Sequence, residues 1–171
     1  MKKIVLLLSM SFATLLSLFP FPSSAQDNFT LYLVRHAEKA STKQDPALTA
    51  CGQSRANQLS TILRNIEIEA VYSTAYKRTM STAQPTAKSK SIPIKQYAPN
   101  GLEQLARELI AQQKSGLIVG HSNTTPQLAS ILTGQTINEM TEKEYQHLFQ
   151  VTFINGEALL TKLSQPLTCP Q

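Results

Sequence analysis

A short apolar run that stops at an Arg-His pair constrains the fold more than any other stretch. Phe29 to Val34 is apolar and β-branched, which is typical of a strand buried in a parallel sheet. Arg35 and His36 follow at once, and the polar residues after them cannot continue a buried strand. In open α/β sheets, ligands bind beyond the carboxyl ends of the strands. The segment therefore predicts an α/β sheet with an Arg and a His at its ligand-binding edge.

Two further apolar runs end in the same way. Leu117 to Gly120 is followed by His121, and Val71-Tyr72-Ser73 leads within a few residues to Arg78. Taken alone, the first segment also fits a surface Arg and a capping His. Three such ends favour a shared site, because the carboxyl ends of parallel strands meet at one edge of the sheet. Two His and two Arg gathered there would form a concave cationic pocket suited to phosphate.

The same segments resemble a known family. Residues 33–38 (Leu-Val-Arg-His-Ala-Glu), 72–79 (Tyr-Ser-Thr-Ala-Tyr-Lys-Arg-Thr) and 119–122 (Val-Gly-His-Ser) resemble the three signatures of the histidine phosphatase superfamily, in the same order. Residues 48–53 (Leu-Thr-Ala-Cys-Gly-Gln) resemble the Leu-Thr-x-x-Gly segment of its phosphoglycerate-mutase-like branch. The resemblance spans about residues 29–153. It implies a three-layer α/β/α sandwich with a mostly parallel central sheet, the phosphoglycerate mutase-like fold.

The resemblance also implies roles for four residues. His36 would attack phosphorus and carry the phosphoryl group as a phosphohistidine, which then hydrolyses. Arg35, Arg78 and a cationic His121 would hold the phosphoryl oxygens, where charge develops in the transition state. This chemistry requires no metal and no cofactor. His147 is expected to be a surface or packing histidine.

The leaving oxygen needs a proton, and the resemblance points to a carboxylate after the second Arg. Glu103 has a comparable spacing from Arg78, but an exposed glutamate in a first helical turn would equally suit the helix dipole. Glu108 and Glu38 are the alternatives, although Glu38 could instead pair with Lys39.

The chain departs from the branch at positions that contact substrate. Ala37, Lys39 and Thr42 stand where the branch commonly has Gly, Ser and Asn. Lys39 either adds a cation to the pocket rim or points to solvent. His121 is followed by Ser122 rather than Asp, which disfavours the acid phosphatase and phytase branch.

The first residues have the pattern of a signal peptide. Lys2 and Lys3 precede an apolar stretch from Ile4 to Phe19, which two prolines interrupt before the small residues Ser23-Ser24-Ala25. We expect residues 1–25 to be removed, leaving 26–171 as one periplasmic or secreted domain without stable membrane association. An uncleaved anchor is the alternative, although the stretch is short for a span of about 20 residues.

Charge and cysteine content add two expectations. The formal net charge of +5 falls to +3 without Lys2 and Lys3, which suits an anionic substrate. No basic cluster interleaved with aromatic residues indicates nucleic acid. Cys51 and Cys169 are the only cysteines. In an exported protein they could form a disulfide, or remain two separate buried thiols.

The remaining pattern predicts alternating strands and helices. Helices are expected at about 49–64, from residue 76 onward, at 102–113 and at 126–133. Strands are expected within 66–72, at 92–97 and at 117–120, with a terminal hairpin of 151–154 and 158–163 around Asn155-Gly156. Residues 139–147 read as a polar segment, helical or irregular.

These features predict a phosphohydrolase that acts on small phosphate monoesters through His36. One alternative is a phosphate-binding module of the same fold without a working proton donor. Another is a phosphoglycerate mutase-like phosphotransferase, which the short chain and the expected export disfavour. A metal-binding protein using His36, His121 and His147 lacks the accompanying ligand spacing. The sequence leaves the substrate and the oligomeric state open.

Overall fold

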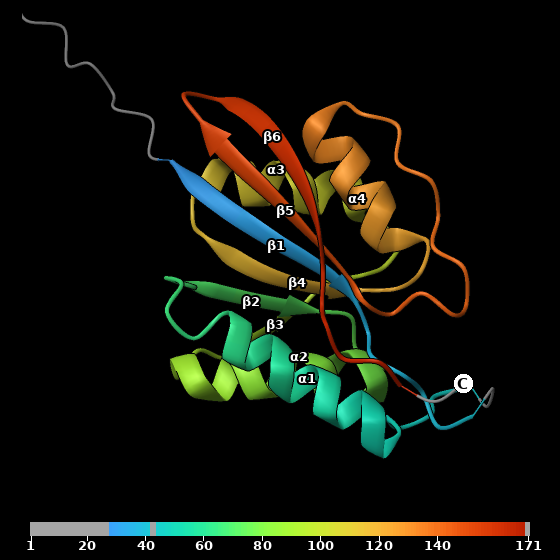
Figure 1. Ribbon diagram of the computed structural model, residues 1–171. Helices are drawn as coiled ribbons and strands as arrows, with labels where there is room; N and C mark the ends of the chain where they lie inside the picture. The colour runs from blue at the N-terminus through green and yellow to red at the C-terminus, as the bar shows by residue number, and fades with distance from the viewer. Residues whose placement is uncertain (1–27, 42–43, 170–171) are drawn as a thin grey trace, which may run out of the picture.

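A mixed six-stranded sheet lies between two pairs of helices in the computed structural model (Figure 1). The structure describes residues 28–41 and 44–169, so the predicted signal peptide and Thr42 lie outside it. The elements, in chain order, are β1 (Phe29–Arg35), α1 (Ala50–Ile62), β2 (Ala70–Ser73), α2 (Lys77–Lys90), β3 (Ile94–Gln96), α3 (Leu102–Gln112), β4 (Gly116–Gly120), α4 (Thr124–Thr133), β5 (His147–Ile154) and β6 (Glu157–Ser164).

The strand order β3-β2-β4-β1-β5-β6 brings three strand ends together. Strands β1 to β4 run parallel, whereas β5 and β6 are antiparallel additions at one side. In the register of the sheet, Arg35 at the end of β1 lies opposite Gly120 at the end of β4. Ser73 at the end of β2 lies opposite Val119. The predicted three-layer architecture is confirmed.

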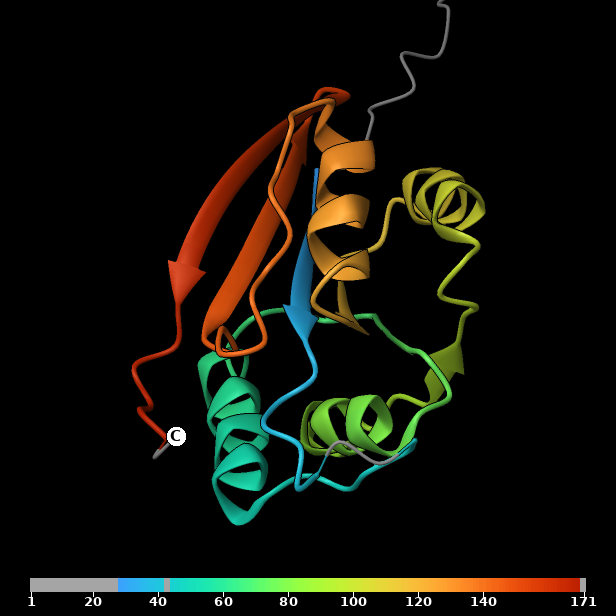
Figure 2. The same ribbon diagram turned by 90° about the vertical axis from the view of Figure 1, so that its right-hand side faces the viewer.

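The two faces of β1 explain its continuous apolar sequence. Leu31 and Leu33 pack in the core under α3 and α4, whereas Tyr32 and Val34 pack under α1 and α2. Successive side chains of a strand point to opposite faces, so a strand covered on both sides needs apolar residues throughout. Figure 2 shows the two helix pairs on either side of the sheet.

Two large apolar residues of the helices are exposed. Ile62 in the last turn of α1 is 39% exposed and Ile110 of α3 is 40% exposed. Each is one residue from a buried leucine, Leu63 and Leu109. A step of one residue turns the side chain by about 100° around the helix, and the leucines already face the core.

The polar segment at 139–147 forms no helix. Its middle is a turn, and β5 begins at His147 rather than at residue 151. The strand starts earlier because Leu148 and Phe149 are buried and pair with Val34 and Leu33 of β1. The hairpin turn falls at Asn155-Gly156 as predicted, with φ angles of 51° and 86°, a backbone region that these two residue types tolerate.

The C-terminal tail is fastened to the start of α1. Cys51 and Cys169 form a disulfide, as one of the two sequence alternatives proposed. Beside it, Arg55 donates a hydrogen bond from Nη2 to the carbonyl oxygen of Leu167 at 3.1 Å. Thr49 caps α1 by accepting from the backbone N–H of Gly52 at 2.9 Å. Among the described residues, no helix has both the length and the apolar character needed to span a membrane.

Candidate active site

The four residues predicted to hold phosphate line one pocket of about 430 Å³. Arg35 ends β1, His36 follows it, His121 follows β4, and Arg78 lies in the first turn of α2. The backbone N–H of His36 donates to the carbonyl oxygen of Gly120 at 2.9 Å, which joins the two strand ends. As a result the imidazole rings of His36 and His121 lie 5.6 Å apart.

His36 is held as a neutral imidazole with one unprotonated nitrogen. The side chain is 3% exposed, and its Nδ1 lies 2.8 Å from the carbonyl oxygen of Ala37. A carbonyl oxygen only accepts, so Nδ1 carries the proton and Nε2 keeps its lone pair. Burial first, and then the positive charges of Arg35 and Arg78, lower the pKa of His36 from 6.5 to about 3. The hydrogen bond to Ala37 opposes this shift but does not reverse it.

Burial and neighbouring cations also favour the neutral form of His121 in the free site. Burial, and then the charges of Arg78 and Arg35, lower its pKa to about 4. Nη2 of Arg78 donates to Nδ1 of His121 at 3.4 Å. Nε2 of His121 therefore carries the proton and donates to Oγ1 of Thr74 at 3.0 Å. The ring therefore presents a fixed tautomer. An anion bound beside it would raise its pKa, because an opposite charge favours the protonated form.

Arg35 is the most deeply buried cation of the pocket. The residue is 2% exposed, and its Nη1 donates to the carbonyl oxygens of Thr141 at 2.7 Å and Glu144 at 3.3 Å. Its guanidinium lies 4.1 Å from the centre of the Tyr145 ring. Its Nη2 lies 3.2 Å from a carboxylate oxygen of Glu142. The turn before β5 thus surrounds this arginine.

Arg78 and Lys39 complete the positive charge. The Arg78 guanidinium stacks 4.4 Å from the centre of the Tyr76 ring, with its Nη1 3.9 Å from Asp45. Lys39 lines the pocket and reaches Glu142 at 3.0 Å, which is the rim position that the sequence left open. The Nε atoms of Arg35 and Arg78 are buried and have no hydrogen-bond partner within the described residues.

The predicted proton donors lie elsewhere. Glu103 is exposed in the first turn of α3 and is not among the residues that line the pocket, although the neighbouring Pro99 and Asn100 are. Glu108 accepts a hydrogen bond from Gln112 on the surface of the same helix. Glu38 pairs with Arg55 at 2.6 Å, not with Lys39.

Glu142 is the acidic residue that sequence reasoning missed. It lines the pocket, yet it lies far along the chain from the other site residues, in a segment without a recognisable motif. Only the pairing of β5 with β1 brings this segment to the arginine. His147, expected to be a surface or packing residue, pairs with Glu144 at 3.0 Å.

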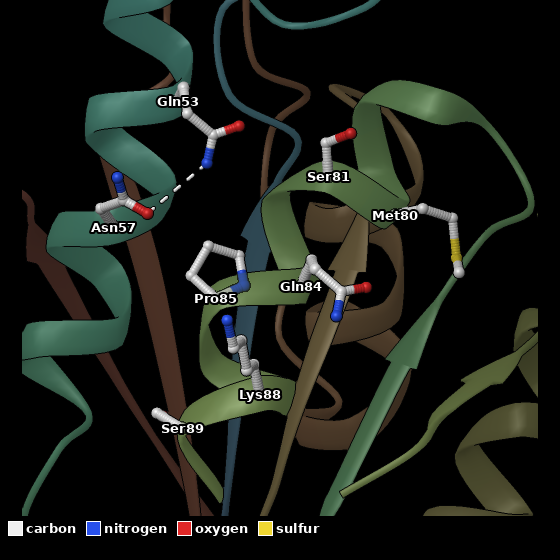
Figure 3. A pocket seen from close by; sticks show the side chains of 8 residues that line it. All are labelled: Gln53, Asn57, Met80, Ser81, Gln84, Pro85, Lys88 and Ser89. Atoms are coloured by element: carbon white, nitrogen blue, oxygen red, sulfur yellow. Dashed lines mark hydrogen bonds between the residues drawn. The ribbon is translucent and has the colours of Figure 1, made fainter. Parts of the chain in front are cut away.

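Two other cavities lie outside this pocket. One of about 650 Å³ runs between α1 and α2, lined by polar side chains such as Gln53 and Lys88 (Figure 3). Another of about 780 Å³ lies under the C-terminal tail. It shares Glu142 with the pocket that contains His36 and His121, called the histidine pocket below. Within the described ranges no three His, Cys, Asp or Glu side chains are grouped as metal ligands.

Comparisons with known proteins agree with the motifs. The model of the histidine phosphatase superfamily (branch 1) matches residues 31–98. A probable phosphatase of Schizosaccharomyces pombe is 37% identical over 81 residues. That match covers 42% of this chain and 29% of the yeast protein, so the chain spans less than a third of that relative.

Solved structures share the fold. The protein histidine phosphatase SixA, in complex with tungstate, superposes with a TM-score of 0.66 at 17% identity, covering 80% of this chain and 97% of SixA. Phosphoglycerate mutase from Bacillus anthracis gives a TM-score of 0.63 at 14% identity, covering 81% of this chain and 94% of the mutase. The family-model match over residues 31–98 and the shared fold agree with the superfamily that the motifs predicted.

Proposed function

We propose that this chain is a member of the histidine phosphatase superfamily and hydrolyses small phosphate monoesters through a phosphohistidine on His36. The observation that carries the proposal is the state of that residue: a buried, neutral imidazole whose Nδ1 is engaged and whose Nε2 is unprotonated. Only an unprotonated nitrogen can attack phosphorus. Arg35, Arg78 and Lys39 line the same pocket, and their charge favours the approach of a phosphate dianion.

In the proposed reaction, the oxygens of the phosphoryl group bind Arg35 and Arg78, whose guanidinium groups provide paired donors. Nε2 of His36 attacks phosphorus, and the bond to the leaving oxygen breaks. Water then attacks the phosphohistidine, which releases inorganic phosphate and restores the neutral imidazole. His121, which becomes protonated more easily beside an anion, adds a further donor to the phosphoryl oxygens. The sequence predicted Glu103 as the donor of the proton to the leaving oxygen.

The names of similar proteins support a phosphatase. The yeast relative is a probable phosphatase, and SixA is a protein histidine phosphatase solved with tungstate. Tungstate is a tetrahedral oxyanion, and the pocket here offers the charge that such an ion needs. The pocket volume of about 430 Å³ exceeds that of a single phosphate group, which leaves space for part of the substrate.

We further propose that the protein works outside the cytoplasm as the domain 26–171. The N-terminal pattern supports export. The Cys51–Cys169 disulfide supports it independently, because such bonds persist mainly in oxidising compartments. Phosphoglycerate mutase activity is a weaker candidate, since its substrates are metabolites of the cytoplasm.

Turnover by purified protein tests the proposal. Wild type should hydrolyse 4-nitrophenyl phosphate, and His36→Ala should lose that activity while keeping its melting temperature within a few degrees. Lys88→Ala, which removes an exposed cation outside the pocket, should remain active. Quenching wild type and ³²P-labelled substrate in alkaline detergent, which preserves a phosphohistidine, should trap label on the protein, and His36→Ala should trap none. Turnover at the wild-type rate in His36→Ala would rule out His36 as the nucleophile.

A folded, inactive wild type that binds phosphate would favour the binding module. Activity that disappears in EDTA and returns with a divalent cation would favour a metal mechanism.

A further inference from the structure

The Glu142 carboxylate forms ion pairs with two cations of the histidine pocket. Its Oε2 is 3.2 Å from Nη2 of Arg35 and 3.0 Å from Nζ of Lys39. Its Oε1 accepts from the hydroxyl of Ser122, the residue after His121, at 3.4 Å. The side chain is nevertheless 67% exposed. It therefore touches the groups that would bind the phosphoryl oxygens, and it remains accessible to a substrate.

The turn that carries Glu142 is held in place from two sides. Glu144 accepts a hydrogen bond from the backbone N–H of Thr141 at 2.7 Å, and its other oxygen pairs with His147 at 3.0 Å. Arg35 donates to the carbonyl oxygens of Thr141 and Glu144. Glu142 lies between these anchored residues, so its backbone is positioned by contacts that do not involve its own carboxylate.

Glu142 also lies between two cavities. It lines the pocket of about 430 Å³ that contains His36, and it lines the cavity of about 780 Å³ under the C-terminal tail. A substrate with its phosphoryl group among the arginines has room on the far side of Glu142 for the rest of the molecule. No other Asp or Glu among the described residues lines the histidine pocket.

We propose that Glu142 transfers the proton in both halves of the reaction, an inference that rests on the proposed phosphatase function. In the first half, Nε2 of His36 forms the bond to phosphorus, the bond from phosphorus to the ester oxygen breaks, and protonated Glu142 gives its proton to that oxygen. The products are the alcohol, the phosphohistidine and a Glu142 carboxylate. In the second half, the carboxylate takes a proton from the attacking water while the phosphorus–nitrogen bond breaks. Inorganic phosphate leaves, and Glu142 is protonated again.

The surrounding charges account for both states of this carboxyl. The hydrogen bond from Lys39, aided by the charges of Arg35, lowers the pKa of Glu142 below its ordinary value, so the free site holds a carboxylate. His36, which also faces it, is neutral. A bound phosphate dianion would take the bonds of Arg35 and Lys39 and place a like charge nearby. Both changes raise the pKa of the carboxyl, which favours proton uptake when the substrate binds.

Leaving-group dependence separates proton transfer from a purely structural role. The variant Glu142→Gln keeps the size and the hydrogen-bonding capacity of the side chain but carries no acidic proton. Glycerol 2-phosphate expels a basic alkoxide, whereas 4-nitrophenyl phosphate expels a stable nitrophenolate. A positioned acid contributes about 10²–10⁴-fold, so kcat/KM for glycerol 2-phosphate should fall by that order. For 4-nitrophenyl phosphate it should fall less than about tenfold, since that leaving group hardly requires the acid.

The second half of the reaction supplies an independent readout. Without the carboxylate as base, the phosphohistidine of Glu142→Gln should hydrolyse slowly. Rapid mixing with 4-nitrophenyl phosphate should then give a burst of nitrophenolate close to one equivalent per protein, followed by slow turnover. Glu139→Gln is the matched control, because Glu139 is exposed in the same segment and has no contact with the pocket. Glu103→Gln tests the donor predicted from the sequence.

The outcomes are distinct. A selective loss with glycerol 2-phosphate together with the burst supports the assignment. Equal, small effects on both esters, matching those of Glu139→Gln, would overturn it, and a selective loss in Glu103→Gln would then assign the acid to α3. A higher kcat/KM for both esters would also overturn it, since Glu142 would merely compete with phosphate for Arg35 and Lys39. These outcomes can be interpreted in this way only when the His36→Ala variant is inactive. If that variant remains active, the phosphatase mechanism itself is wrong.

Discussion

The free energy of unfolding should decrease at acid pH because His36 is protonated more easily in the unfolded chain than in the folded protein. Folding lowers the pKa of this imidazole from 6.5 to about 3, mainly by burial. Between these values the unfolded chain binds a proton that the folded protein does not, so the free energy of unfolding falls as the pH falls from about 6.5 toward 3. From pH 7 to pH 5, the shift corresponds to a loss of roughly 2 kcal/mol from this one residue.

The comparison that isolates this effect is wild type against His36→Asn. Asparagine does not titrate, and its side-chain amide can replace Nδ1 as a donor to the Ala37 carbonyl oxygen. Urea denaturation at pH 7 and pH 5 gives the free energy of unfolding of both proteins. Wild type should lose about 2 kcal/mol more than His36→Asn over this interval, because the other titrating groups are common to both.

An equal pH dependence for wild type and His36→Asn would refute the reasoning. It would mean that the imidazole titrates alike in the folded and unfolded chains, and therefore that burial does not hold it neutral. Nε2 of His36 would then carry a proton at mildly acid pH and could not act as a nucleophile there. Because the pKa of His36 is about 3, its protonation should not limit turnover until the pH approaches that value.

Two further predictions concern the framework of the site. Replacing Cys51 and Cys169 by serine should lower the free energy of unfolding by about 3–5 kcal/mol in the chain-entropy model, because the bridge closes a long loop; unchanged denaturation relative to the oxidised wild type would argue against a stabilising bridge. In Gly120→Ala, the added Cβ would lie 2.9 Å from Oγ1 of Thr124, and overpacking of this kind costs about 1–3 kcal/mol. We expect a lower melting temperature and reduced turnover, whereas Gly101→Ala, whose Cβ would meet nothing closer than 3.5 Å, should behave as wild type; equal behaviour of the two variants would contradict the packing argument.

Local sequence was sufficient where the physical cause is local. The apolar run of β1 and the Asn155-Gly156 turn each depend on residues close together in the chain, and the structure contains both. The clustering of Arg35, His36 and His121 was also predictable. It follows from a general property of parallel sheets, whose carboxyl ends share one edge.

Features that depend on contacts between distant segments were decided only by the tertiary structure. The neutral state of His121 arises from burial and from Arg78, whose guanidinium comes from another element. Glu142 meets Arg35 although more than a hundred residues separate them, because β5 pairs antiparallel with β1 and brings the preceding turn to the pocket. The pairing of Cys51 with Cys169 was only one alternative until the path of the tail was known. Residue types and spacing thus determined which groups could carry the chemistry, whereas the long-range pairing of strands decided their charge state and their neighbours.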